Sequence, residues 1–379
     1  MKILGIESSA DETAAAVVED GYKLLGNAVA SSLDLHIAFG GIVPEIAARS
    51  HLEVILPVID EALWQAFSPD AEDRELSIEN GGKIPNSQFP IPNSSDLWSQ
   101  IDAIAVTQGP GLIGSLLIGA LTARTLAITK GKPLYGVNHV LAHAYANFIT
   151  EASSSLPATY LLPPTAPKFP ILGLIVSGGH TQLMLYKNHK DYEMLGQTRD
   201  DAVGEAYDKV AKILGLPYPG GPSVDRAAAD GDPLVVKLPQ AKLDNPYEFS
   251  FSGLKTAVLR AAQAMAGQDY TFPSYELPHA LTDKQKADIA ASFQKTAVKA
   301  LVDATAAAEA EFKPKTVLLA GGVAANRLLR EELAKRLKAP LLYPDIKLCT
   351  DNAAMIAATA FWLKPKQDNP YKLAVIPNL

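Results

Sequence analysis

Two histidines stand four residues apart, His139 and His143, in the segment GVNHVLAHAYA. On a helix, side chains at positions i and i+4 lie one above the other on the same face, so both imidazoles can reach one ion. Asn138 follows a short apolar run and is a favourable N-cap, which predicts a strand followed by a helix with His139 in its first turn. The pair indicates half of a metal site. The alternative is two helix-face histidines that hydrogen-bond to neighbouring groups.

Asp351 could complete this site. It lies at the start of an apolar segment, residues 349–363, which predicts a helix with Thr350 as its N-cap; a carboxylate there is also stabilised by the helix dipole. If this last helix returns to the histidines, the carboxylate adds an oxygen ligand. Two histidines and one carboxylate leave coordination positions open for water or substrate and suit Fe(II) or Zn(II). A metalloprotease is disfavoured, because HVLAH lacks the glutamate of HExxH.

Asp11 and Glu12 are the candidate catalytic carboxylates. They stand in the polar link between two apolar runs, residues 2–8 and 13–18, which predict a hairpin. They are either turn carboxylates in water or acids close to a reacting group. The serine and threonine neighbours of the pair favour the second interpretation.

A set of three strand-like runs joined by tight polar turns occurs twice in the chain. These strands must position the candidate metal ligands and carboxylates. They are residues 2–8, 13–18 and 23–30, and residues 170–176, 181–186 and 193–197. A buried strand, a glycine turn and a helix follow each set, over residues 101–127 and 316–337. The repetition predicts an α/β protein with internal pseudo-symmetry.

The repetition also predicts two lobes. We expect one lobe at residues 1–137 with about 351–379, and the other at residues 138–350. Residues 67–99 and 151–168 are rich in proline, serine and other polar residues, so they are expected to form surface insertions.

Bulk composition is that of a globular protein, with 379 residues of which 48% are hydrophobic and 20% charged. Cys349 is the only cysteine, so no disulfide can form within the chain, which is compatible with a reducing cytosol. The most apolar stretch, residues 113–123, is about half as long as a membrane span, and the start lacks a secretory signal. We therefore expect a soluble, cytoplasmic protein that does not enter a membrane. The net charge of −7 means that nucleic acid needs a local basic patch or a basic partner. Residues 313–338 are the best candidate patch, and the alternative is that they form a solvated helix face.

Glycine-rich turns between strand and helix leave backbone N–H groups beside the positive end of a helix dipole, which suits phosphate oxygens. Any one such turn is more often a plain tight turn, but four of them, including Gly178–Gly179 and Gly321–Gly322, together indicate a nucleotide clamp. The sequence contains neither GxxxxGK[ST] nor GxGxxG, so P-loop and Rossmann sites are disfavoured.

Nine motifs follow one another along nearly the whole chain outside the two insertions. They are GIESSADETAAAVV, GGIVPEIAARSH, TQGPGLIGSLLIG, VNHVLAHAYA, LIVSGGHTQL, GEAYDKVAKILGLPYPGGPSVD, FSFSGLKTAV, LAGGVAANRLLR and CTDNAAMIA. In type and order they resemble the motifs of the TsaD family, the tRNA threonylcarbamoyladenosine transferases once labelled O-sialoglycoprotein endopeptidases.

The resemblance implies the actin-like (ASKHA) two-lobed ATPase fold shared with sugar kinases and heat-shock chaperones, with duplicated βββαβα units. It implies transfer of the threonylcarbamoyl group from threonylcarbamoyl-AMP to N6 of adenosine 37 in tRNAs that read codons beginning with A. The product is t6A and AMP is released. The implied partners are tRNA, an adenylate-forming enzyme that supplies the substrate, a paralogous actin-like subunit and a small P-loop ATPase.

Carried over by position, the resemblance makes His139, His143 and Asp351 the ligands of one divalent metal, with Fe(II) favoured and Zn(II) possible. The residues that it assigns to the adenylate are Ile175, Val176, Ser177, Gly178, Gly179, Asp208, Gly221, Asp225 and Asn326. Archaeal and eukaryotic members place a tyrosine ligand where this chain has Ile175. That difference implies a bacterial-type member whose metal has three protein ligands.

Two other functions stay open from the sequence. An ATP-hydrolysing relative of sugar kinases or chaperones would share the nucleotide clamp but would not need the histidine pair. A nucleotide-binding regulatory scaffold would keep the fold with a vestigial site.

Overall fold

The computed structural model describes residues 1–68, 94–151 and 168–379 and divides into two compact units. The first unit is Met1–Pro167 with Thr350–Leu379, and the second is Lys168–Cys349. The first boundary comes later than the expected position after residue 137. The reason is that α5 (His139–Tyr145) packs on α12 (Ala353–Leu363), and β6 (Thr150–Glu151) pairs with a strand of the first unit.

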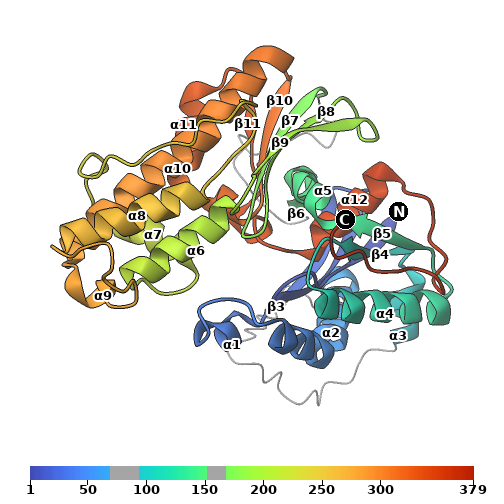
Figure 1. Ribbon diagram of the computed structural model, residues 1–379. Coiled ribbons are helices and arrows are strands. Elements are labelled where there is room, and N and C mark those ends of the chain that lie inside the picture. The colour runs from blue at the N-terminus through green and yellow to red at the C-terminus, as the bar shows by residue number, and fades with distance from the viewer. Residues whose placement is uncertain (69–93, 152–167) are drawn as a thin grey trace. The chain divides into compact units, whose positions relative to one another are not determined.

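A six-stranded sheet in the order β5-β4-β1-β2-β3-β6 forms the centre of the first unit (Figure 1). Its other strands are β1 (Lys2–Glu7), β2 (Glu12–Glu19), β3 (Lys23–Ser31), β4 (Ala103–Gly109) and β5 (Leu134–Asn138). The other helices of the unit are α1 (Leu33–Ile37), α2 (Pro44–Phe67), α3 (Ser94–Ser99), α4 (Ile113–Lys130) and the short 3-10 helix η2 (Ala146–Phe148).

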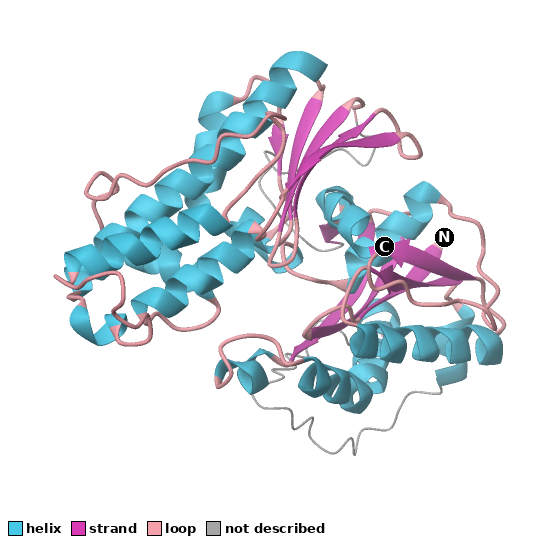
Figure 2. Cartoon of the chain, in the orientation of Figure 1, coloured by secondary structure: helices cyan, strands magenta, loops and turns pink. Residues whose placement is uncertain are grey.

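The two faces of this sheet differ in side-chain size. Leu4 and Ile6 of β1 belong to the core cluster that includes α2 residues such as Val58, and Figure 2 shows α2 and α4 on that side. Because side chains alternate along a strand, Gly5 points to the other face, where α12 packs. A Cβ at Gly5 would lie 2.1 Å from the Ala353 carbonyl oxygen. The absence of a side chain at Gly5 therefore lets α12 approach β1 closely.

The second unit is built on a five-stranded sheet in the order β11-β10-β7-β8-β9. Its strands are β7 (Ile171–Val176), β8 (Thr181–Tyr186), β9 (Tyr192–Gln197), β10 (Thr316–Ala320) and β11 (Leu341–Leu342). Its helices are α6 (Val203–Leu214), α7 (Gly220–Ala228), α8 (Ser252–Met265), α9 (Leu277–Ala280), α10 (Asp283–Phe312), α11 (Arg327–Arg336) and the 3-10 helices η3 (Gly322–Ala325) and η4 (Ile346–Leu348).

The two sheets repeat one topology, which confirms the predicted duplication. In each, the first strand pairs antiparallel with the second and parallel with the fourth, as in β1 with β2 and β4, and in β7 with β8 and β10. The strand order third, second, first, fourth, fifth is the same in both. The fold is α/β with a duplicated unit.

The prediction that Thr350 caps the last helix is wrong. Helix α12 begins at Ala353, and the Asn352 side chain caps it by accepting a hydrogen bond from the Met355 N–H at 3.0 Å. The Asn352 amide also donates to the Thr350 carbonyl at 2.8 Å. Asp351 therefore precedes the cap, so its carboxylate lies outside the first helical turn.

Only part of the expected insertions can be compared with the structure. Ser94–Ser99 form α3, and Trp98 is 6% exposed and belongs to the core of the first unit. This end of the segment is not a surface insertion, because its large apolar side chain is buried. Residues 69–93 and 152–167 lie outside the described residues.

Helix α4 extends the apolar stretch that begins at residue 113 to 18 residues, which is long and apolar enough to cross a membrane by length and composition alone. Its 18 residues are apolar enough, and 33% of them are buried. This is weak evidence for a span, because core helices of soluble proteins meet the same criterion. Helix α4 packs on β4 and α2, and the Arg124 side chain donates to the Pro370 and Tyr371 carbonyls.

Candidate metal centre

The two histidines enter the site from a helix that begins where β5 ends. The Asn138 side chain caps α5, since its Oδ1 accepts a hydrogen bond from the Leu141 N–H at 3.0 Å. This confirms the predicted cap and places His139 at the first helical position. His139 is 5% exposed and His143 1%, and their rings meet edge to face with centroids 4.7 Å apart.

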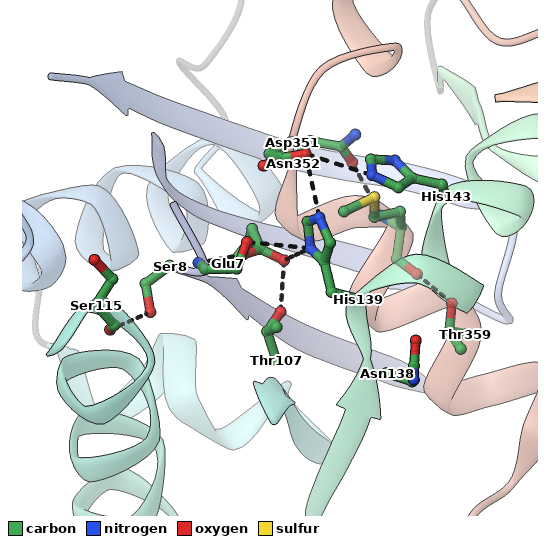
Figure 3. A network of polar contacts seen from close by, with 12 residues as sticks. Glu7, Ser8, Thr107, Ser115, Asn138, His139, His143, Asp351, Asn352 and Thr359 are labelled. Atoms are coloured by element: carbon green, nitrogen blue, oxygen red, sulfur yellow. Dashed lines mark hydrogen bonds and ion pairs between the residues drawn. The ribbon is translucent and has the colours of Figure 1, made fainter. Parts of the chain in front are cut away.

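Asp351 meets both histidines, as Figure 3 shows. Its Oδ1 lies 3.4 Å from His139 Nε2 and 3.5 Å from His143 Nε2. One ligand atom from each residue lies within 4.8 Å of the others. Two ligands bound at about 2.1 Å and separated by the tetrahedral angle are about 3.4 Å apart, so the spacing and the donor set fit a single divalent ion.

A fully buried carboxylate, Glu7, lies behind His139. Its Oε2 accepts hydrogen bonds from His139 Nδ1 at 2.9 Å and from the Thr107 hydroxyl at 2.5 Å, and its Oε1 accepts from the Ser9 N–H at 2.6 Å (Figure 3). Glu7 and Thr107 lie on neighbouring strands, β1 and β4. The sheet thus supplies a negative group on the side of the His139 ring that faces away from Asp351.

These contacts set the charges of the site. Burial raises the pKa of Glu7, but the interaction with His139 outweighs it and holds that pKa below its ordinary value. Burial lowers the pKa of His139, but the Glu7 and Asp351 carboxylates raise it well above its ordinary value. The surroundings of the triad are therefore electronegative, which favours a cation there.

Asp11 and Glu12, the two candidate catalytic residues, lie at the tip between β1 and β2. Asp11 is 8% exposed and Glu12 is partly exposed. Burial raises the pKa of Glu12 well above its ordinary value, and the negative charges of Asp11 and Asp351 raise it further. This direction of shift suits a carboxylate that takes part in proton transfer.

Two buried histidines hold this tip in place. The Nδ1 of His51 lies 2.7 Å from the Thr13 hydroxyl, and its Nε2 lies 3.0 Å from the Ala10 carbonyl oxygen. The Ser32 hydroxyl, which lies 3.1 Å from His36 Nε2, donates to the Asp11 carbonyl at 2.8 Å. His51 therefore contacts the tip directly, His36 reaches it through Ser32, and neither belongs to the candidate metal triad.

In the second unit, the residues predicted to contact an adenylate begin with the tip between β7 and β8. Ile175 and Val176 are 0% exposed, so only their backbone can meet a ligand. Ser177 is buried and its hydroxyl accepts from the His180 N–H at 3.1 Å. Gly178 and Gly179 are exposed, and a Cβ at either would meet nothing within 4 Å. Their backbone is open to a ligand.

The other predicted contacts come from α6, α7 and the turn after β10. Gly220 and Gly221 form the first turn of α7. The Gly220 N–H donates to Asp208 Oδ1 at 2.7 Å, and a Cβ at Gly221 would meet nothing within 4 Å. Asp225 Oδ1 accepts from the Asn326 amide at 3.3 Å. The structure thus pairs the side chains of Asp225 and Asn326, whereas Asp208 accepts from the backbone at the start of α7.

Sequence reasoning missed Glu7, Thr107 and Gln294. The Gln294 amide donates to Asp225 Oδ1 at 2.9 Å, and this side chain is 6% exposed. Gln294 belongs to the alanine-rich α10, where nothing in the local pattern sets it apart. For Glu7, one signal was available, because it is a charged residue at the end of an otherwise apolar strand.

A family model described as "TsaD: tRNA N6-adenosine threonylcarbamoyltransferase" matches residues 23–71 and 93–358. This chain belongs to the TsaD family. The matched segments contain the candidate metal triad and every adenylate residue predicted in the second unit.

Curated TsaD relatives carry the name tRNA N6-adenosine threonylcarbamoyltransferase. The protein of Symbiobacterium thermophilum is 49% identical over 95% of this chain and 91% of its own length. That of Thermomicrobium roseum is 48% identical over 96% and 92%, respectively. That of Dehalococcoides mccartyi is 43% identical over 100% and 99%, so the similarity includes the β1–β2 tip.

Solved structures resemble this TsaD chain in fold. A crystal structure of T. kodakarensis HypF has a TM-score of 0.55 at 14% identity, covering 95% of this chain and 47% of HypF. Full-length HypF in a phosphate- and nucleotide-bound form has a TM-score of 0.52 at 12% identity, covering 96% and 46%. At such identities the likeness concerns the fold alone, which is the predicted actin-like α/β fold.

Proposed function

We propose that this chain transfers the threonylcarbamoyl group from threonylcarbamoyl-AMP to N6 of adenosine 37 in tRNAs that read codons beginning with A. The observation that carries the proposal is the convergence of His139, His143 and Asp351 in a chain of the TsaD family. A sugar-kinase or chaperone-type ATPase, or a regulatory scaffold, does not need such a triad. Both are disfavoured by that observation and by the family.

The three residues would hold one divalent ion, and we propose Fe(II) in first place and Zn(II) in second. Two imidazole nitrogens and one carboxylate oxygen suit either ion. When bound, the ion supplies a Lewis acid that can polarise a carbonyl oxygen of the substrate. The same three protein ligands leave coordination positions open for that oxygen.

The second unit is proposed to bind the adenylate part of the substrate. The open backbone at Gly178 and Gly179 suits phosphate oxygens, because it lies beside the first turn of α6. Gly204 belongs to that turn, and a Cβ on it would lie only 2.8 Å from Gly178 Cα. Asp208 and Asp225 offer carboxylate oxygens that can accept hydrogen bonds from ribose hydroxyls. Ile175 and Val176 can contribute only backbone groups to this site.

Glu12 and Asp11 are proposed to manage the proton of the reaction. The N6 nitrogen forms a bond to the carbamoyl carbon, the bond from that carbon to the phosphate oxygen breaks, and AMP leaves. The attacking nitrogen must lose a proton. The raised pKa of Glu12 makes its carboxylate form a stronger base than an ordinary glutamate, and Asp11 contributes to that shift through its negative charge.

Transfer to tRNA needs a surface for the anionic substrate. In the candidate patch of residues 313–338, Lys335 contacts Glu332 at 2.7 Å, and the Arg330 guanidinium stacks 4.2 Å from the Tyr343 ring centre. Arg330 is thus engaged within the fold, whereas Lys335 and Arg336 are exposed and are the pair of basic groups chosen for the test. We propose that a paralogous actin-like subunit and a small P-loop ATPase assist the chain, and that an adenylate-forming enzyme supplies the substrate in the cytoplasm.

Reconstitution tests the proposal. The protein is incubated with threonine, bicarbonate, ATP, the adenylate-forming enzyme, the two partner proteins and unmodified tRNA, and nucleosides are analysed by mass spectrometry. We expect t6A with the wild type and its loss with His139→Ala or His143→Ala, whose folds stay intact by circular dichroism. Rapid ATP turnover by the chain alone, with no t6A under any condition, would favour the ATPase instead.

A further inference from the structure

The carboxylate of Glu7 is buried at 0% exposure and has no part in the proposed proton transfer. A buried carboxylate is costly unless its oxygens are hydrogen-bonded or paired with a positive charge. Glu7 has three donors, from Ser9, Thr107 and His139, at 2.5 to 2.9 Å. Its orientation is therefore fixed by contacts with the β1–β2 tip, strand β4 and helix α5.

We propose that Glu7 is a positioning residue for the metal centre, which fixes the proton of His139 on Nδ1 and so directs Nε2 to the ion. An ionised carboxylate can only accept hydrogen bonds, so the His139 nitrogen that faces it must be the donor. The ring has two nitrogens, and the other, Nε2, faces Asp351 at 3.4 Å. The hydrogen bond on one side of a ring thus sets which nitrogen is available to a metal.

Ser9 reinforces this arrangement. Its backbone N–H occupies Glu7 Oε1, and its hydroxyl lies 3.2 Å from His139 Nδ1. The Thr107 hydroxyl shares Oε2 with the imidazole, so that oxygen has two donors. The carboxylate cannot turn away from His139 without losing hydrogen bonds on both oxygens.

The Glu7→Gln variant keeps the shape of this side chain but changes its hydrogen-bonding groups. If the amide oxygen faces His139 and Thr107, the NH2 group meets the Ser9 N–H, and two donors then oppose each other. If the NH2 group faces His139, Nδ1 has to accept, and the ring proton moves to Nε2, where the ion should bind. Metal binding therefore requires the first orientation, whose opposed donors cost free energy, so Glu7→Gln is expected to weaken metal binding.

The inference rests on the proposed metal site, so the test measures metal binding without turnover. Zn(II) affinity is determined by competition with a chromophoric chelator for the wild type, Glu7→Gln, His139→Ala and Glu19→Gln. The last variant is a matched control, because Glu19 also ends a strand but pairs with Lys23 on the surface. We expect Glu7→Gln to weaken Zn(II) binding about 10–100-fold, and Glu19→Gln to leave it unchanged.

Nitrogen-15 NMR of histidine-labelled wild type reads the proton position directly. In the Zn(II)-loaded protein we expect His139 to show a protonated Nδ1 and a metal-bound Nε2. This measurement needs no variant, so a metal-bound Nδ1 would overturn the proposal even where Glu7→Gln does not fold.

The outcomes separate the two proposals. Zn(II) binding that depends on His139 but is unaffected by Glu7→Gln, or a metal-bound Nδ1, overturns the role of Glu7 alone. A wild type that binds no Zn(II), or a His139→Ala variant that binds it as tightly as the wild type, overturns the metal site and the role of Glu7 with it.

Discussion

Replacing Gly5 by alanine tests whether close packing of α12 on the sheet brings Asp351 to the histidines. The added Cβ would lie 2.1 Å from the Ala353 carbonyl oxygen, and side-chain Cβ atoms do not approach heavy atoms closer than 3.0 Å. The start of α12 would therefore have to move away by roughly 1 Å in a closely packed core. Both contacting groups belong to regular backbone, so no side-chain rotation can relieve the contact.

The magnitude follows from this geometry. Overpacking a core costs about 1–3 kcal/mol, and we expect the upper end, since the obstacle is backbone. Asp351 precedes Ala353 by two residues, so its carboxylate moves with the helix start. We expect metal affinity to fall at least about tenfold, which corresponds to about 1.4 kcal/mol.

Urea denaturation and Zn(II) titration measure the two effects. Gly41→Ala is the control, because a Cβ at that position meets nothing within 4 Å. A Gly5→Ala protein that matches Gly41→Ala in both stability and Zn(II) affinity would refute the argument that Gly5 places the third ligand.

Three further predictions concern the tip histidine, the adenylate residues and the basic patch. Burial lowers the pKa of His51 in the folded protein, so below the unfolded-state pKa of about 6.5 the unfolded chain binds more protons than the folded one. The free energy of unfolding should therefore fall as the pH drops from about 6.5 through the lower pKa of the folded state. Urea denaturation at several pH values should show a weaker dependence of stability on pH in His51→Gln. Gly220→Ala should destabilise the second unit, since the added Cβ would lie 2.5 Å from Asp208 Cα. Gly221→Ala should keep the fold, because a Cβ there meets nothing within 4 Å, but should weaken AMP binding in a titration. Equal AMP affinity for Gly221→Ala and the wild type contradicts a contact between Gly221 and the adenylate. Reversing the charges of Lys335 and Arg336 should lower tRNA affinity and its salt slope, and unchanged values in filter-binding titrations would move the tRNA surface elsewhere.

Features that depend on neighbours in the chain could be predicted from the sequence. The i, i+4 spacing and the Asn138 cap gave α5 with its two histidines, because helix geometry is local. Alternation of apolar and small polar segments predicted the hairpins of both sheets. Their recurrence predicted the duplicated topology.

Features that depend on competition between neighbours or on long-range packing were harder. Thr350 and Asn352 are both acceptable caps, and the structure uses Asn352, whose amide also binds the Thr350 carbonyl. Trp98 stands in a polar segment, yet it is buried because the core of the first unit has room for its ring. Propensity alone does not rank such alternatives.

The sequence by itself determined the residue types of the proposed metal centre and the family to which the chain belongs. The tertiary structure decided how they meet. Asp351 lies 212 positions after His139 in the chain, and only the close approach of α12 to Gly5 carries its carboxylate to 3.4 Å from the imidazole. Glu7 became a partner of His139 because strand alternation turns it to the face that α5 and α12 cover. Hydrogen bonds and ligand distances depend on separations in space, which a linear pattern does not contain.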